Sequence, residues 1–277
     1  MTAGFWESIF VSLVATVAAY WQKFLTVPGA VAAAILGSII LFFGGWGWGA
    51  TTAGSFLITA FLSQLQDCDE SNNSSSKRAR RNLNQVLANG LLLTVLAVLY
   101  RASDANIAFL ASFLGCVGAV AGDTWATSAS QFSTRDPRLL TTGQRVPAGT
   151  PGAVTGIGIA LTALAGFVAS VLYLSVAAIH GADTAPGAVR VTLGVAAIIG
   201  AVAGSIFDSY LGAACQAIYT DADGRVTDHP AANNGRLNTY VRGWRWLSND
   251  LVNFSNSVAG ATSAYCVWIA AVWLEIV

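Results

Sequence analysis

The chain has 277 residues, of which 55% are hydrophobic and only 10% charged, with a formal net charge of zero and a mean hydropathy of +0.59. An ordinary soluble domain carries about 25% charged residues. The composition therefore excludes an ordinary soluble domain and indicates a single integral membrane domain over residues 1–277. The four cysteines have no CxxC or other metal-site spacing, which favours small core residues over zinc ligands or disulfides. No nucleic-acid partner is expected.

Eight stretches are apolar and near the roughly 20 residues that a transmembrane helix needs. The first begins without a basic segment or a cleavage site, which favours a span over a signal peptide. A glycine-rich turn at residues 44–49 joins the second stretch to the third. The sequence predicts an all-α, multi-pass transmembrane helix bundle with about eight spans, at 5–22, 27–43, 50–65, 86–101, 106–129, 152–179, 189–218 and 250–276.

The basic residues support this count, because cytoplasmic loops of membrane proteins carry an excess of Lys and Arg. With residues 66–85 in the cytoplasm and the spans alternating, the inner segments hold all but two of the 14 Lys and Arg. The exceptions are Arg101 and Arg190. The sequence therefore predicts polar cytoplasmic loops at 66–85, 130–151 and 219–249, with both termini on the lumenal or exterior side.

A short sequence, GAVAG, occurs at residues 118–122 and again at 200–204, and an aspartate follows each copy. Small residues recur in this way on helix-packing faces. A diverged internal duplication, whose two halves meet at a site, gives the same pattern. Both interpretations stay open at this point.

Three carboxylates, Asp123, Asp208 and Asp250, lie inside or at the edge of apolar stretches. A charge in hydrocarbon costs about 3 kcal/mol on insertion scales, so such residues gather around water, a cation or one another. The predicted topology places all three in the cytoplasmic half. In the last span, Asp250 and Asn253 are three residues apart, and Asn256 continues the same helical face.

Carboxylate and amide oxygens suit Mg²⁺, which binds through one or two carboxylates together with phosphates. The loop after Asp123 carries arginines, which complement phosphate oxygens, and a glycine-rich stretch whose N–H groups would form an anion site. A plain Pro- and Gly-rich turn is the alternative. The basic run that ends residues 66–85 is either a topology signal or a further set of phosphate ligands. The candidate phosphate-binding residues are Arg138, Thr142, Arg145, Gly149, Thr150, Lys77 and Arg81.

Six blocks of this sequence resemble a family of integral membrane proteins known as domain of unknown function 92. The family includes plant phytyl-phosphate kinase and animal transmembrane protein 19. The blocks run through nearly the whole chain in the family's order. They are KFLTVPGAVAAAILG (23–37), RRNLNQVLANG (80–90), GDTWATSAS (122–130), PRLLTTGQRVPAGTPGAVTGIG (137–158), GSIFDSYLGAACQ (204–216) and NDLVNFSNSVAGA (249–261).

The resemblance implies a membrane-embedded kinase that transfers phosphate from a nucleoside triphosphate, CTP being expected, to an isoprenyl monophosphate such as phytyl phosphate. The expected partners are this lipid-soluble phosphate, the nucleotide and membrane lipid; endoplasmic reticulum and plastid envelope are both compatible locations. On this hypothesis Asp123, Asp208 and Asp250 hold Mg²⁺. Asp250 and Asn253 complete the site or orient the acceptor, while the basic residues neutralise phosphate charge.

Two other hypotheses remain. Intramembrane aspartates and glycine-rich helices also suit a cation- or proton-coupled transporter. A transporter needs its carboxylates near the membrane midplane, whereas a kinase keeps them near one face. The third hypothesis is a scaffold in which the aspartates only pair helices.

Overall fold

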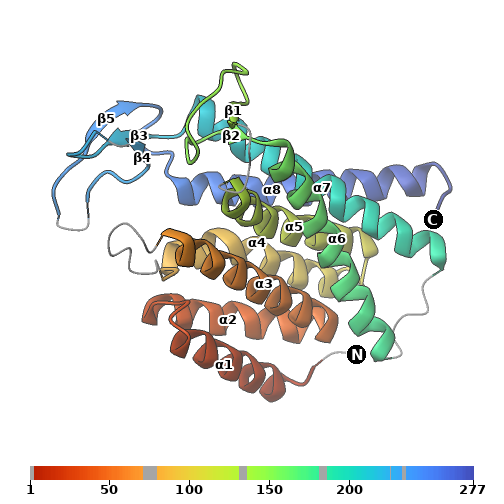
Figure 1. Cartoon of the computed structure of the whole chain (residues 1–277). Helices are drawn as coiled ribbons and strands as arrows, with labels where there is room; N and C mark the ends of the chain where they lie inside the picture. The colour runs from red at the N-terminus through yellow and green to blue at the C-terminus, as the bar shows by residue number, and fades with distance from the viewer. Residues whose placement is uncertain (1–2, 71–79, 131–135, 181–185, 225, 233–234) are drawn as a thin grey trace.

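Eight helices form one bundle in the computed structural model, which describes residues 3–70, 80–130, 136–180, 186–224, 226–232 and 235–277 (Figure 1). The side chains of 64–70 and 129–130 are not among those described. The helices are α1 (Phe5–Trp21), α2 (Val27–Gly44), α3 (Trp46–Glu70), α4 (Leu83–Ala102), α5 (Ile107–Ser130), α6 (Gly156–Ile179), α7 (Gly187–Ala214) and α8 (Asn249–Trp273).

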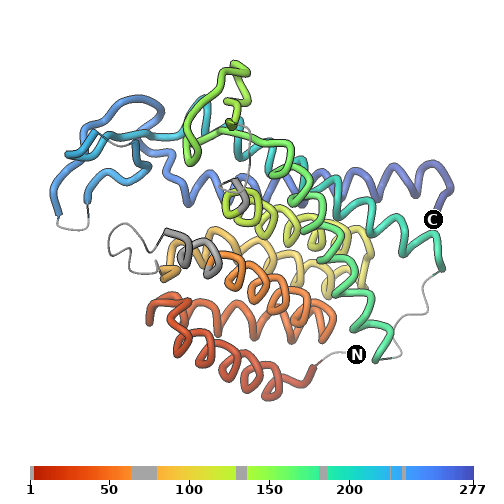
Figure 2. The backbone as a smooth tube through the Cα atoms, in the orientation of Figure 1, coloured from red at the N-terminus to blue at the C-terminus, as the bar shows by residue number. Residues whose placement is uncertain are grey.

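Successive helices run in opposite directions, so both chain ends lie at one end of the bundle (Figures 1 and 2). The α1–α2 turn and the described parts of the α3–α4, α5–α6 and α7–α8 connections lie at the opposite end, called the loop end below. This arrangement agrees with the predicted alternation. The cytoplasmic location of the loop end stays a prediction.

Five of these helices, α2, α4, α5, α6 and α7, are long and apolar enough to cross a membrane. Helix α1 is apolar but shorter, with 17 residues. Helices α3 and α8 have 25 residues each, and both carry polar residues at the loop end, in QLQDCDE and NDLVNFSNS. The predicted polytopic helix bundle is confirmed.

Side-chain caps set four of the helix starts at the loop end. Thr26, Asn82, Thr155 and Ser248 each accept a hydrogen bond from a backbone N–H in the first turn of the helix that follows. Such a cap satisfies one of the backbone donors that a helix N-terminus leaves free. These caps explain why the chain enters α2, α4, α6 and α8 at those residues.

The structure corrects three of the predicted span boundaries. Helix α3 begins at Trp46 and not at residue 50, because only Gly45, with φ of 84°, interrupts the helical backbone between α2 and α3. Helix α6 begins at Gly156, since the preceding Ala153–Val154 forms a strand. Helix α7 ends at Ala214, and the chain then enters another strand at Ile218.

Two small sheets lie at the loop end of the described structure. Strands β1 (Arg138–Leu139) and β2 (Ala153–Val154) form an antiparallel hairpin between α5 and α6. Strands β3 (Ile218–Thr220), β4 (Val226–Thr227) and β5 (Thr239–Arg242) form a sheet in the order β4-β3-β5 between α7 and α8. Residues 130–151 and 219–249 were predicted only as polar loops, and such short strands leave almost no hydropathy period.

Helix α5 is the most buried of the candidate spans and packs against α6, α7 and α8. Small residues allow this close approach. A Cβ on Gly200 would lie 2.8 Å from Gly115 Cα and 2.6 Å from Gly260 O. A Cβ on Gly118 would lie 2.9 Å from the Ala201 Cβ. Both GAVAG copies therefore serve helix packing, which brings the aspartates that follow them into one region.

Candidate functional site

Two of the predicted carboxylates come together near the loop end. Asp123 lies in the last two turns of α5 and Asp208 in the last two turns of the neighbouring α7. The charge of Asp123 acts on Asp208. Oδ2 of Asp208 is buried and has no hydrogen-bond partner among the described residues. A buried carboxylate oxygen that lacks a hydrogen-bond partner and lies beside a second carboxylate fits a bound cation. Without a cation, the negative charge of the two carboxylates would remain uncompensated.

A polar group of α6 lies close to this carboxylate pair. The buried hydroxyl of Thr162 lies 3.0 Å from Gly158 O, 3.3 Å from Gly122 O and 3.5 Å from Ser205 Oγ. Ser205 lies three residues before Asp208, so it occupies the adjacent turn of the same helix. Thr162 therefore ties α6 to the turns of α5 and α7 that carry the two aspartates.

Asn256 of α8 lies beside this site, on the helical face that continues from Asn253, although it is not among the site residues expected from the sequence. It is 1% exposed, and its Nδ2 donates a hydrogen bond to Ala119 O at 3.2 Å. Its Oδ1 is buried without a partner among the described residues. A Cβ on Gly204 would lie 2.5 Å from that oxygen. Since Ala119 and Gly204 each precede a paired aspartate by one turn, Asn256 lies one turn deeper in the bundle.

Arg81 is a candidate phosphate ligand on which the charge of Asp123 acts. Burial lowers the pKa of Arg81, and the negative charge of Asp123 acts in the opposite direction. The guanidinium lies over the ring of Phe56, 5.3 Å from its centroid, which is a cation–π geometry. From the sequence, Arg81 is only one of several candidate phosphate ligands.

The backbone of Arg81 is fixed against the α1–α2 turn. Its N–H donates to Phe24 O at 2.9 Å, and its carbonyl accepts from Thr26 N at 3.0 Å and Thr26 Oγ1 at 3.3 Å. A Cβ on Gly29 would lie 2.6 Å from the same carbonyl, so α2 needs a glycine there. Arg81 is thus held in place by contacts with residues far from it in the sequence.

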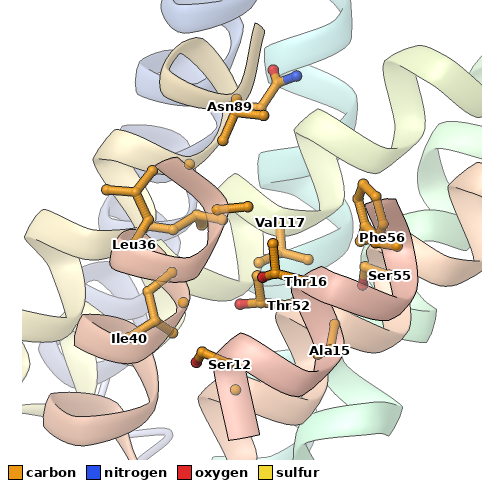
Figure 3. Close-up of a pocket in the computed structure, with 18 of the residues that line it drawn as sticks. Ser12, Ala15, Thr16, Leu36, Ile40, Thr52, Ser55, Phe56, Asn89 and Val117 are labelled. Atoms are coloured by element: carbon orange, nitrogen blue, oxygen red, sulfur yellow. The ribbon is translucent and has the colours of Figure 1, made fainter. Parts of the chain in front are cut away.

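A cavity of about 310 Å³ lies between α1, α2, α3, α4 and α5 (Figure 3). Its lining is mostly apolar or small, and Arg81 belongs to it. Val120 also lines the cavity, and Asp123 is three residues further along α5, on nearly the same helical face. One end of the cavity therefore lies within about one helical turn of Asp123. A sequence feature that points to such a cavity is the inward face of α1, which carries only small residues: Ser8, Ser12, Thr16 and Ala19.

Asp250 does not join Asp123 and Asp208. Its charged neighbours are Asp228 and His229, in the connection between β4 and β5. Within the described residues no three His, Cys, Asp or Glu side chains are grouped so as to hold a metal ion. The described structure therefore does not group Asp250 with Asp123 and Asp208 as a metal site, because the first turn of α8 lies by the connection between β4 and β5. Asn253 is partly buried, one turn after Asp250.

The predicted phosphate loop folds as the β1–β2 hairpin, and its polar side chains bond to other groups of the same loop. Arg138 Nη1 donates to Gly143 O at 3.0 Å, and Arg145 lies 3.7 Å from Asp136 in an exposed ion pair. Thr142 Oγ1 accepts from Gln144 N, and Thr150 Oγ1 donates to Pro147 O. Gly149, with φ of 82°, has open space around it. The hairpin presents its arginines to solvent at the loop end. Lys77 lies outside the described residues.

Gly152 attaches this hairpin to the end of α7. Its φ is 81°, and a Cβ there would clash with the backbone of Ala213. We expect Gly152→Ala to release the hairpin and speed trypsin cleavage after Arg138 and Arg145, measured by mass spectrometry of the detergent-solubilised protein. Gly149→Ala is the matched control, because it carries the same left-handed backbone cost but meets no atom within 4 Å. Equal cleavage of both variants would show that the contact with Ala213 does not hold the hairpin.

The fold and site define an integral membrane protein with a polytopic helical bundle and a carboxylate pair near one end. The chain belongs to the integral membrane protein DUF92 family, whose model matches residues 10–261. It is 27% identical to Protein PGR of Arabidopsis thaliana over 288 residues, covering 96% of each chain. It is also 27% identical to the uncharacterized membrane protein MJ0933 of Methanocaldococcus jannaschii over 189 residues, covering 67% of this chain and 72% of that protein. No solved structure matches the chain.

Proposed function

We propose that this protein is a membrane-embedded kinase that transfers a phosphoryl group from a nucleoside triphosphate, CTP being expected, to an isoprenyl monophosphate such as phytyl phosphate. One observation carries the proposal: Asp123 and Asp208 are paired beside Arg81 at the end of an apolar cavity. A metal-binding carboxylate pair and a cation are the groups that phosphoryl transfer requires. The resemblance of the sequence blocks to a family that includes phytyl-phosphate kinase supplies the reaction and the substrate class.

In this reaction an oxygen of the isoprenyl monophosphate attacks the γ-phosphorus of the nucleotide. A new P–O bond forms, the bond from the γ-phosphorus to the bridging oxygen breaks, and the nucleoside diphosphate leaves with that electron pair. The attacking oxygen is already an anion, so no strong general base is needed. Positioning and neutralisation of charge would supply most of the rate enhancement.

In this proposal the acidic residues bind the metal ion and the basic residues bind the phosphates. Asp123 and Asp208 would hold Mg²⁺, which when bound would neutralise the negative charge of the nucleotide phosphates. The orphaned Oδ2 of Asp208 supports this assignment. Arg81 would bind the phosphate of the acceptor. Arg138 and Arg145, exposed at the loop end, are candidates for the nucleotide phosphates.

The test is an assay of the purified full chain in detergent. It combines Mg²⁺, each of the four common nucleoside triphosphates, and phytyl, farnesyl or geranylgeranyl phosphate. We expect the isoprenyl diphosphate to form, fastest with CTP, and to be lost when EDTA removes the metal. Formation of no diphosphate with any of these pairs, by protein that is monodisperse and binds the lipid, would contradict the proposal.

The transporter hypothesis remains the alternative, because the buried Oδ1 of Asn256 and Oδ2 of Asp208 would also suit a cation in transit. The position of the carboxylates favours the kinase. Asp123 and Asp208 lie in the last two turns of their helices and not at mid-helix. Cation flux into vesicles by the wild-type protein, without any diphosphate formed, would replace the kinase proposal with the transporter.

A further inference from the structure

We propose that the cavity between α1 and α5 binds the hydrocarbon tail of the isoprenyl phosphate inside the protein, with the phosphate at Arg81. This inference rests on the proposed function and deepens it, because it assigns a place to the tail. Asp123 and Asp208, the proposed metal ligands, lie near the end of the cavity that Arg81 occupies.

The size and shape of the cavity suit one flexible chain. Its volume of about 310 Å³ is at the lower end of the range of roughly 300–1,000 Å³ for small-molecule sites. On α3 the lining extends from Trp46 to Thr59, which corresponds to about 20 Å at the rise of an α-helix. The cavity is therefore long and narrow, and its length is about two thirds of the thickness of a hydrocarbon core, which is about 30 Å.

Apolar side chains and two satisfied hydroxyls form much of the wall along this length. Leu36, Ile40, Phe56 and Val117 contribute apolar surface (Figure 3). The hydroxyl of Thr52 donates to Trp48 O at 3.0 Å, within its own helix. Thr59 does the same to Ser55 O at 2.7 Å. Polar lining residues with satisfied hydroxyls behave toward a ligand as small apolar groups, so an unbranched or methyl-branched hydrocarbon fits the cavity.

One end of the cavity is polar and cationic. Arg81 lies there, together with Gln85 and Asn89 from the first turns of α4. Phe56 holds the guanidinium from one side, and the α1–α2 turn fixes its backbone. A ligand with an anionic head and a long apolar tail matches this distribution. A free phosphate would leave the apolar part of the cavity unfilled.

The cavity opens between α1 and α3. Ala15 on α1 and Ala53 on α3 both line it, and both are exposed. Helix α1 packs on α2, whereas it makes few contacts with α3. A lipid in the surrounding membrane would therefore enter sideways, through the gap between two alanines, without passing through water.

The test is native mass spectrometry of the full chain in detergent with Mg²⁺ and no nucleotide, titrated with geranylgeranyl phosphate or with inorganic phosphate. The wild type should bind one geranylgeranyl phosphate, and more tightly than inorganic phosphate. Ala15→Phe fills the opening and should weaken geranylgeranyl phosphate binding about tenfold or more. Val14→Phe is the matched control: the neighbouring side chain is 53% exposed and does not line the cavity, so binding should not change.

Ala53→Phe, on the opposite rim, repeats the test in case Ala15→Phe does not give monodisperse protein. Wild-type affinity in both phenylalanine variants would overturn the inference, as would equal affinity of the wild type for geranylgeranyl and inorganic phosphate. The two proposals fail differently. If Ala15→Phe weakens geranylgeranyl phosphate binding but the wild type forms no diphosphate, the kinase proposal fails and the proposal of a tail site stands. If Ala15→Phe and Ala53→Phe both form diphosphate normally with an unchanged KM for the isoprenyl phosphate, the proposal of a tail site fails and the kinase proposal stands.

Discussion

Asp123→Asn is expected to lower the kinase turnover number by about 100-fold or more, the scale seen when one preorganised electrostatic group is removed. The amide keeps the shape of the side chain but loses the negative charge that Mg²⁺ needs. The Mg²⁺ concentration for half-maximal rate should rise as well, which a purely structural role would not explain. The measurement is the rate of diphosphate formation as a function of Mg²⁺ concentration.

This loss should not come from unfolding. Asp123 repels Asp208 and attracts Arg81, so neutralising it removes one unfavourable and one favourable interaction, whose effects on stability oppose each other. Asp223→Asn, in the exposed turn between β3 and β4, is the control and should leave the rate unchanged. Full turnover by a monodisperse Asp123→Asn protein would rule out Asp123 as a metal ligand.

Arg81→Gln is expected to raise the KM for the isoprenyl phosphate by about 10- to 100-fold, because a charged hydrogen bond to phosphate contributes roughly 1.5–3 kcal/mol. The neighbouring Arg80→Gln is the matched control. Arg80 is exposed, whereas Arg81 lines the cavity and feels the charge of Asp123. Steady-state kinetics with geranylgeranyl phosphate as the varied substrate separates the two. Equal KM values in both variants would mean that Arg81 does not bind the acceptor.

Arg81→Lys adds a pH dependence whose sign follows from burial. Burial lowers the pKa of Arg81, and it would lower that of a lysine in the same place from a smaller starting value. A cation is charged below its pKa and loses its charge as the pH rises through it. The KM of Arg81→Lys should therefore increase with pH over a range in which that of the wild type is flat. A flat profile for the variant would show that the site does not desolvate the cation.

The overall fold was predictable because hydropathy and charge are local properties of the sequence. Each span is recognised from its own apolar residues, and basic loops at one end follow from the count of spans. The same reasoning placed Asp123 and Asp208 near the loop end. It failed for residues 153–154 and 218–220, where very short strands replace the ends of the predicted spans.

The composition of the site was predictable only in part. The sequence treated Asp250 as equivalent to Asp123 and Asp208, since all three lie near the same end. Helix rotation and neighbours decide between them, and α8 directs Asp250 toward Asp228 and His229. From the sequence, Arg138 and Arg145 are candidate phosphate ligands as members of a glycine-rich loop, and Arg81 as a member of a basic run. That loop closes on itself as a hairpin.

The sequence by itself determined an integral membrane bundle of eight helices with acidic and basic residues gathered at one end, because these features sum over neighbouring residues. Only the tertiary structure decided that Asp123 pairs with Asp208, that Asn256 lies below them, and that Arg81 closes a cavity. The small residues of α1 and α3 look alike in sequence whether they pack against a helix or leave a space. The difference depends on where the neighbouring helices lie, and long-range packing alone sets that distance.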